Sequence, residues 1–302
     1  MPAEWIRAIE GTEAGAQAAL GLALLSALAH AAFGALQKGR HDPWLTRGAI
    51  DLCYMLMALP AALWLVPRPT PGLWAALGGA WLIHTVYKLF QAMAYARGAY
   101  TVVYPVARGV GPLATAALAG VVFHESLRPG QWAGAAVLSG AIMALAALNL
   151  RRADAAARAS MAPALALAAL TGLMIAAYTT YDAWGVRLAE DPFTFLAWFF
   201  VIDGWAFPAL ALWRMRRGAW PPPAPGQLAL RALAGAAIAY VSFGAVMLAT
   251  RLDKVGEAAA LRETSTLFAA LIGWLFLGER VGPARAGLMA LIALGAAMVE
   301  FG

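Results

Sequence analysis

Apolar runs of about 20 residues recur along the whole chain, separated by short polar connections. The runs are continuous rather than alternating, which is typical of helices and not of barrel strands, and each is long enough to cross a hydrocarbon core of roughly 30 Å. The pattern predicts ten spans, at about residues 16–36, 44–66, 72–96, 99–123, 130–149, 162–184, 192–213, 227–249, 255–277 and 281–300. We therefore expect an all-α integral membrane protein.

Composition agrees with this class. Of 302 residues, 62% are hydrophobic and 13% are charged, whereas soluble proteins carry about 25% charged residues. Most of the basic residues lie in short connections such as "RMRRGAW" (214–220), where they set membrane orientation rather than bind nucleic acid. The single cysteine, Cys53, excludes a disulfide within the chain and a cysteine-based metal cage.

The two halves of the chain are similar at a fixed spacing of 154 positions. Met93, Arg97, Arg108 and Glu125 fall on Met247, Arg251, Arg262 and Glu279, without a gap across two spans. This predicts two five-helix repeats, residues 1–150 and 151–302. Because each repeat has an odd number of spans, the second must insert upside down, and inverted repeats are typical of transporters with a site near the midplane.

The motifs "YPVARGVGPL" (104–113) and "ALRETSTLFAALIGWLFLGERV" (260–281), with the glutamates that close spans four and nine, resemble the EamA-type transporters of the drug/metabolite transporter superfamily. The resemblance covers nearly the whole chain. It implies a ten-helix carrier of the bacterial inner membrane, commonly an exporter of amino acids or other metabolites. It does not identify the solute.

Polar residues at helical spacing inside apolar spans indicate surfaces that face the interior of the bundle. The candidate substrate-binding residues on these stripes are Arg108, Arg262, Glu263, Tyr104, Tyr87, Gln91, Tyr95, His84, His30, Tyr178 and Asp182. Together they would form a cavity with aromatic walls, hydrogen-bonding groups and two fixed positive charges. Such a lining suits a small polar or amphipathic solute that carries a carboxylate or phosphate.

Two roles are open for Arg108, which lies deep in span four. It binds the anionic group of the solute, or it forms an ion pair with Glu263. Because the repeats are inverted, we expect Arg108 and Arg262 on opposite sides of the midplane, each facing one entrance. Glu263, Asp182 and His30 are the candidates for proton coupling.

For the other ionisable residues in or beside the spans, a structural role is an alternative to a role in solute binding. Lys88 either faces the interior or extends along its stem toward the membrane surface. Asp51 and Asp203 are expected to bond neighbouring helices, and Glu125 and Glu279 to have a structural role at matching helix ends.

We expect a hinge in span four. Its residues are Pro105, Gly109, Gly111 and Pro112, because the prolines cannot donate to the carbonyls four residues earlier. Span nine has no such residues and is expected to be an unbroken, more rigid wall.

These features predict a secondary-active transporter that exports its solute by alternating access. A multidrug or cation efflux carrier is the alternative, and a membrane-embedded enzyme or a channel is a more remote one. The chain has no His-Glu-x-x-His, Gly-x-Ser-x-Gly or Walker motif, so we expect no enzyme activity and no cofactor or metal.

The expected partners are the small-molecule solute and the lipid bilayer, with coupling either to protons or to exchange of a second solute. We expect no nucleic acid and a monomer or weak homodimer. The orientation stays open, because the distribution of Lys and Arg places both termini outside the cytoplasm, whereas the resemblance suggests the reverse.

Overall fold

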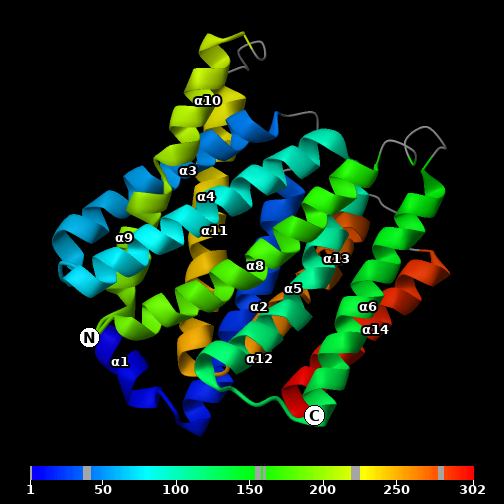
Figure 1. Cartoon of the computed structure of the whole chain (residues 1–302), viewed down its shortest axis with the longest axis horizontal. Helices are drawn as coiled ribbons and strands as arrows, with labels where there is room; N and C mark the ends of the chain where they lie inside the picture. The colour runs from blue at the N-terminus through cyan, green and yellow to red at the C-terminus, as the bar shows by residue number, and fades with distance from the viewer. Residues whose placement is uncertain (1, 37–41, 154–157, 159–160, 219–224, 278–281) are drawn as a thin grey trace.

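The computed structural model describes residues 2–36, 42–153, 158, 161–218, 225–277 and 282–302, and in this part of the chain every regular element is a helix (Figure 1). In chain order the helices are α1 (Pro2–Ile9), α2 (Glu13–Leu36), α3 (Pro43–Pro60) with its π-helical continuation η1 (Ala61–Leu65), α4 (Pro71–Arg97), α5 (Tyr100–Phe123), α6 (Pro129–Arg152), α8 (Ala162–Leu188), α9 (Pro192–Asp203), α10 (Ala206–Arg216), α11 (Pro225–Leu252), α12 (Val255–Arg262), α13 (Ser265–Leu277) and α14 (Pro283–Phe301).

The predicted all-α membrane class is confirmed. Within the described ranges, eight helical segments are long and apolar enough to cross a membrane. The two predicted spans outside this set are α4, which carries a stripe of polar residues, and the span formed by α12 and α13, which is broken into two short helices. The short helix α1 was not predicted; it packs Ile6 into a core cluster with Ala19 and Ala23 of α2.

Helix starts follow local sequence chemistry. The Asp191 side chain accepts a hydrogen bond from the Phe193 amide at 2.9 Å, and Pro192 opens α9. Thr70 likewise caps α4 by accepting from the Leu73 amide at 3.3 Å. Such caps satisfy amide groups that have no partner within the helix.

The break expected in span four is absent. Helix α5 runs through Pro105 and Pro112 as one helix. The Thr101 carbonyl, which Pro105 cannot bond, accepts a hydrogen bond from the Asn149 side chain of α6 at 2.8 Å. The helix is therefore not weakened in the way that suggested a hinge. The hinge role of Pro105, Gly109, Gly111 and Pro112 stays a prediction.

The prediction of an unbroken span nine is wrong. Helix α12 ends at Arg262 and α13 begins at Ser265. Between them the Thr264 amide and hydroxyl both bond the Leu261 carbonyl, at 3.1 and 2.7 Å, which tightens the chain into a turn. Threonine hydroxyls compete with helix amides for such carbonyls. Span seven also breaks, between Asp203 and Ala206.

The helices pack in pairs that correspond when the two halves are exchanged. The contact of α2 with α11 corresponds to that of α8 with α4, and the contact of α2 with α12 and α13 to that of α8 with α5. Helices α6 and α14, which pack on each other, correspond to one another and lie at one end of the bundle (Figure 1). Two repeats would give this pattern, and the division into residues 1–150 and 151–302 stays a prediction.

Small residues permit the closest approaches between helices. Gly134 of α6 lies against Gly295 of α14, and a Cβ atom added to Gly134 would stand 2.7 Å from the Gly295 carbonyl oxygen. Membrane helices commonly approach through such residues because apolar burial supplies little force between them.

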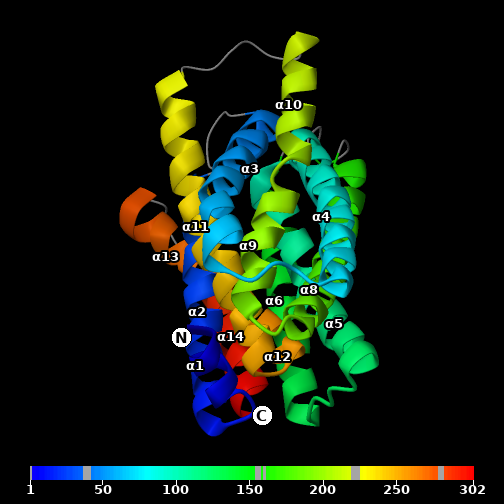
Figure 2. The ribbon, with the colours of Figure 1, turned by 90° about the vertical axis from the view of Figure 1, so that its left-hand side faces the viewer.

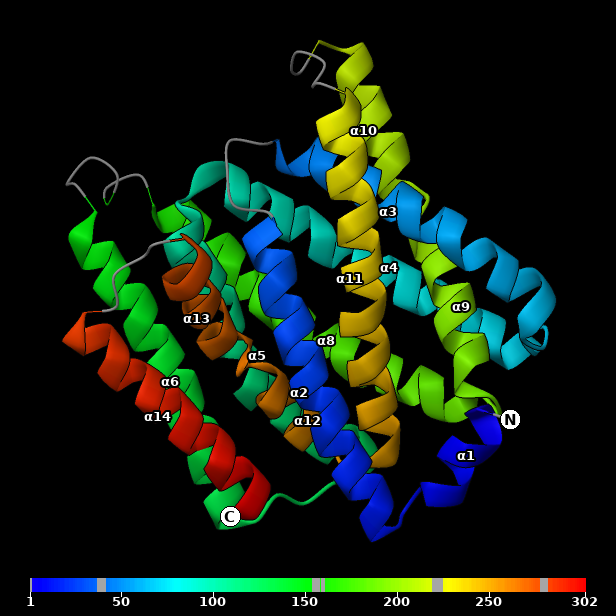
Figure 3. The same cartoon turned by 180° about the vertical axis from the view of Figure 1, so that it is seen from behind.

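Seen from behind, α2 and α11 run side by side through the middle of the bundle (Figure 3). Helix α10 and the start of α11 extend together beyond the other helices at one end (Figure 2).

Candidate functional site

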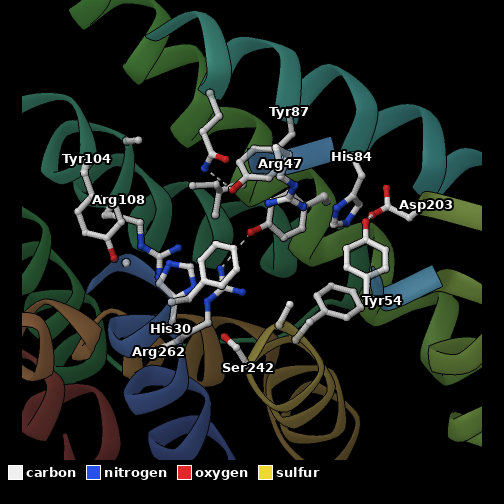
Figure 4. Close-up of a pocket in the computed structure, with 18 of the residues that line it drawn as sticks. His30, Arg47, Tyr54, His84, Tyr87, Tyr104, Arg108, Asp203, Ser242 and Arg262 are labelled. Carbon is white, nitrogen blue, oxygen red and sulfur yellow. Dashed lines mark hydrogen bonds between the residues drawn. The ribbon is translucent and has the colours of Figure 1, made fainter. Parts of the chain in front are cut away.

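A cavity of about 110 Å³ lies between helices of both halves (Figure 4). It is lined by His30, Phe33, Gly34, Arg47, Tyr54, His84, Tyr87, Gln91, Tyr95, Tyr104, Ala107, Arg108, Ile175, Tyr178, Phe199, Phe200, Asp203, Ala239, Ser242, Phe243 and Arg262. Most of the polar side chains come from the stripes that the sequence pattern assigned to the interior.

Nine of the eleven predicted substrate-binding residues line this cavity. They are Arg108, Arg262, Tyr104, Tyr87, Gln91, Tyr95, His84, His30 and Tyr178. The other two lie one contact away, since Glu263 bonds Arg108 and Asp182 bonds His84. The structure thus brings the predicted set together, and its role in binding a solute stays a prediction.

Positive charge gathers at one end of the cavity, where Arg108 and Arg262 lie close together beside His30 (Figure 4). Arg108 Nε is 2.7 Å from Glu263 Oε2, and both side chains are buried. Of the two roles left open for Arg108, the ion pair is therefore present. Both arginines line the same cavity, and the expectation that each faces its own entrance stays a prediction.

Arg262 differs from Arg108 in having no carboxylate against it among the ion pairs of the described residues. Its Nη2 lies 3.5 Å from the Tyr178 hydroxyl, and its Nε has no hydrogen-bond partner within the described ranges. The side chain is nevertheless 4% exposed. Buried guanidinium donors without partners are costly, so Arg262 presents unsatisfied bonding capacity to the cavity.

His84 and Asp182 form a second buried pair, with His84 Nε2 2.6 Å from Asp182 Oδ2. The His84 ring also packs on the Tyr178 and Phe199 rings, with centroids 4.3 and 4.7 Å away. These contacts fix the imidazole at the cavity wall. Asp182 orients it from behind.

A third group centres on Lys88. Its Nζ donates to Asp51 Oδ2 at 2.5 Å, to Asp203 Oδ2 at 2.7 Å and to the Tyr54 hydroxyl at 2.9 Å. Arg47 Nε lies 2.8 Å from the other Asp51 oxygen. Lys88 is 2% exposed, so the interpretation of a lysine extended to the membrane surface is wrong, and the reason is that two carboxylates hold it in the interior.

The three groups share one arrangement. Each joins a basic residue of the first half to a carboxylate of the second half: His84 to Asp182, Lys88 to Asp203, and Arg108 to Glu263. The halves are therefore connected through buried pairs around the cavity. Breaking such a pair is costly because it leaves an uncompensated charge.

Sequence reasoning missed part of the lining. Arg47 lies at the start of a span, where basic residues usually report orientation, and Tyr54 lies in a run without a clear polar stripe. Phe199, Phe200 and Phe243 form a packed aromatic wall, with the Phe199 and Phe243 centroids 4.4 Å apart. Nothing in an apolar run distinguishes such rings from lipid-facing ones.

The two helix-end glutamates have different outcomes. Glu125 accepts from Arg187 Nη2 at 3.1 Å and from the Val255 amide at 2.8 Å, which links α5 to α8 and α12. These contacts match the structural role expected of it. Glu279 lies outside the described residues.

Comparison with known proteins gives three findings. Residues 162–301 match the family model described as the EamA-like transporter family. No curated protein matches the chain. A solved structure titled "Crystal structure of protein" is similar with a TM-score of 0.70 and 20% sequence identity, over 95% of this chain and 96% of that chain. At this identity the likeness concerns the fold alone, and it extends over both halves.

Proposed function

We propose that the chain is a membrane transporter of the EamA-like transporter family, whose model matches residues 162–301, and that it exports a small polar or amphipathic metabolite with an anionic group. An amino acid or a related compound is the solute class that fits best. The transport is secondary-active and proceeds by alternating access between the two halves.

The observation that carries this proposal is the charge balance at the arginine end of the cavity. Arg108 and Arg262 carry two positive charges, and Glu263, which bonds Arg108, carries one negative charge. An anionic group of the solute would neutralise the remaining charge. It would also accept a hydrogen bond from Arg262 Nε, which has no partner among the described residues, in the forked geometry that guanidinium groups favour.

The rest of the lining suits the remainder of such a solute. Tyr87 accepts a hydrogen bond from Gln91 at 2.6 Å, so both groups stand at the wall with some bonding capacity left. The aromatic wall around Phe199 adds apolar surface to the same cavity. A small solute with one anionic end and an apolar or aromatic body matches this division.

The test is counterflow in proteoliposomes. Purified protein is loaded with unlabelled members of a panel of amino acids, carboxylates and phosphate esters, and uptake of the labelled compound is measured. Arg262→Gln should lower the affinity at least about tenfold, because removing one partner of a buried charged contact costs about 2–5 kcal/mol. Arg262→Lys keeps the charge without the fork and should lose less affinity.

Arg97→Gln is the matched control. Arg97 lies at the exposed end of α4 and bonds only a carbonyl of its own helix, that of Met93. Its removal should leave counterflow unchanged. Wild-type affinity in Arg262→Gln, or a wild-type protein that exchanges no anionic compound, would refute the proposal.

An organic cation is a second candidate solute, because Asp203 lies at the other end of the same cavity (Figure 4). Tyr54, which bonds Asp203, packs on Phe200 of the aromatic wall. Aromatic rings and a carboxylate together attract organic cations. Tetraphenylphosphonium serves as the probe. If it is the better solute, Arg262→Gln should raise its affinity rather than lower it, since the variant removes a repelling charge.

The proposed coupling residues Glu263, Asp182 and His30 rest on position alone. Glu263 is bonded to Arg108, and Asp182 to His84, while His30 lines the cavity beside the arginines. All three remain proposals for proton binding. Each is separable from solute binding by comparing pH-driven uptake with counterflow.

A further inference from the structure

The Lys88 cluster (Arg47, Asp51, Tyr54, Lys88 and Asp203) is a closed set of four charges around one tyrosine. Lys88 of α4 is shared between Asp51 of α3 and Asp203 at the end of α9, and Arg47 supports Asp51 from behind. Two positive and two negative charges balance, so the cluster as it stands has no net charge. If the cluster gained one proton, it would carry an uncompensated positive charge in a buried place. Because such a charge is costly, the packing of the helices around the cluster depends on its protonation state.

Asp203 is the member of this cluster that a proton can reach. It is the only carboxylate among the described residues that line the cavity. Its Oδ2 accepts from Lys88 and, at 2.5 Å, from the Tyr54 hydroxyl. Its Oδ1 has no hydrogen-bond partner in the part of the chain that the structure describes. The carboxylate thus has one fully occupied oxygen and one vacant oxygen, at the wall of a polar cavity.

Asp203 also marks a break in the helical path. It is the last residue of α9, and Gly204 and Trp205 separate it from α10. A negative charge at a helix C-terminus is unfavourable with respect to the helix dipole. Lys88 offsets this charge, and its Nζ lies 3.3 Å from the Asp203 carbonyl as well. The lysine therefore acts as both counter-ion and cap for the end of α9.

We propose that Asp203 is the proton-binding site through which a pH gradient drives transport, with Lys88 as the residue that senses its charge. A proton from the cavity adds to Asp203 Oδ1, and the carboxylate becomes a neutral carboxyl group. Lys88 keeps its own proton and its contact with Asp51, and it loses the charged partner that holds it at the end of α9. This inference rests on the proposed transport function and assigns its coupling site.

The groups that face Asp203 set when the proton is bound. From α4 these are Lys88 and His84, from α3 they are Arg47 and Tyr54, and from α8 it is Asp182. Asp51 of α3 acts through Lys88, which it shares with Asp203. The cations favour the charged carboxylate, whereas burial and the two other carboxylates favour the neutral form. A movement of α9 that separates Asp203 from Lys88 would remove the strongest stabilisation of the charge. Proton uptake and this movement are thereby linked.

This position distinguishes Asp203 from the other two carboxylate candidates. Glu263 and Asp182 do not line the cavity, and each is bonded to a basic residue that does. Neutralising Glu263 would also leave two arginines without a counter-charge. Asp203 receives a proton while Asp51 remains available to Lys88.

The experiment compares two transport modes in the same proteoliposomes, with whichever member of the amino acid and carboxylate panel wild type exchanges. Asp203→Asn should lose accumulation driven by an imposed pH gradient. Because Asp203 also lines the cavity, its counterflow is compared only for pH dependence, which the variant should lose. Glu257→Gln is the control, since Glu257 is a buried carboxylate paired with Lys254 at 2.7 Å but lies outside the cavity lining. It should keep both modes. Gradient-driven accumulation in Asp203→Asn at the wild-type level would overturn the proposal.

A second measurement needs no solute. Infrared difference spectra of wild type between acid and alkaline pH should contain a protonated-carboxyl band that is lost in Asp203→Asn and retained in Glu257→Gln. An unchanged band in Asp203→Asn would overturn the proposal even if no solute is found, which separates its failure from that of the proposed function.

If Asp203→Asn does not fold, the double variant Lys88→Gln with Asp203→Asn takes its place in both measurements. The double variant keeps the net charge of the cluster at zero. Loss of the band and of gradient-driven accumulation in the double variant supports the site. Retention of either contradicts it.

Discussion

Arg187 and Arg251 cap each other's helices. Arg187 of α8 donates to the Thr250 and Asp253 carbonyls at the end of α11, at 2.7 and 3.0 Å. Arg251 of α11 donates to the Val186 and Ala189 carbonyls at the end of α8, both at 2.7 Å. These carbonyls have no partner within their own helices, so the exchange satisfies both ends at once. It also ties two helices of the second half together on one side of the cavity.

The counterpart of Arg251 in the first half behaves differently. Arg97, which lies 154 positions earlier, is exposed and bonds the Met93 carbonyl of its own helix. Arg251 is 8% exposed and bonds another helix. The side of the bundle near Arg251 is thus closed by contacts that the matching position near Arg97 does not make.

We expect Arg251→Gln to loosen the closed side. Val255, the first residue of α12, is fully buried there and its amide bonds Glu125. In a Cys53→Ser background, Val255→Cys should react slowly with a membrane-impermeant maleimide. Adding Arg251→Gln or Arg187→Gln should speed the labelling, and adding Arg97→Gln should not. Equal labelling rates in all four proteins would contradict a sealing role for the exchanged caps.

The buried pairs between the halves predict that neither half works alone. Residues 1–150 would present His84, Lys88 and Arg108 to lipid, and residues 161–302 would present the matching carboxylates. Charged groups at membrane depth without partners are strongly unfavourable. Each fragment should be inactive in counterflow, and co-expression should recover part of the activity. Transport by a single fragment would show that the site does not need both halves.

Much of the cavity could be predicted because its residues follow helical spacing in spans that are otherwise apolar. His84, Tyr87 and Gln91 on one helix face all line it. The same rule made an interior position one of two alternatives for Lys88 and could not name its partners, since Asp51 and Asp203 lie on other helices. Pairing across a bundle depends on helix rotation and depth, which a single sequence does not specify.

The helix breaks were the least predictable feature. Pro105 was expected to weaken α5, but Asn149 of α6 satisfies the carbonyl that the proline leaves free. Thr264 carries no strong breaking signal, yet its hydroxyl and amide close a turn on the Leu261 carbonyl. In both cases a side-chain hydrogen bond decided the outcome against the backbone propensity, and its availability depends on tertiary packing.

The His84–Asp182 pair should contribute to stability as a hydrogen bond that orients the imidazole. Asp182→Asn retains an acceptor at the same place, whereas Asp182→Ala leaves a buried ring nitrogen without a partner. We expect Asp182→Ala to lower the free energy of unfolding by about 1–3 kcal/mol and Asp182→Asn to lower it less. Thermal unfolding in detergent measures both. Equal losses in the two variants would mean that the charge of Asp182, and not the hydrogen bond, is what matters.

The Arg108–Glu263 pair separates a structural role of Arg108 from a role in solute binding. Arg108→Gln leaves Glu263 buried without its partner and should cost about 3–5 kcal/mol of stability. Arg108→Gln with Glu263→Gln removes both charges and should recover most of that loss. Arg108 also lines the cavity, so we expect the double variant to be stable and still to bind the solute more weakly than wild type. Thermal unfolding and counterflow affinity for the two single variants and the double give the answer. A double variant with wild-type affinity would show that Arg108 only neutralises Glu263, and the anionic group would then be bound by Arg262 without help from Arg108.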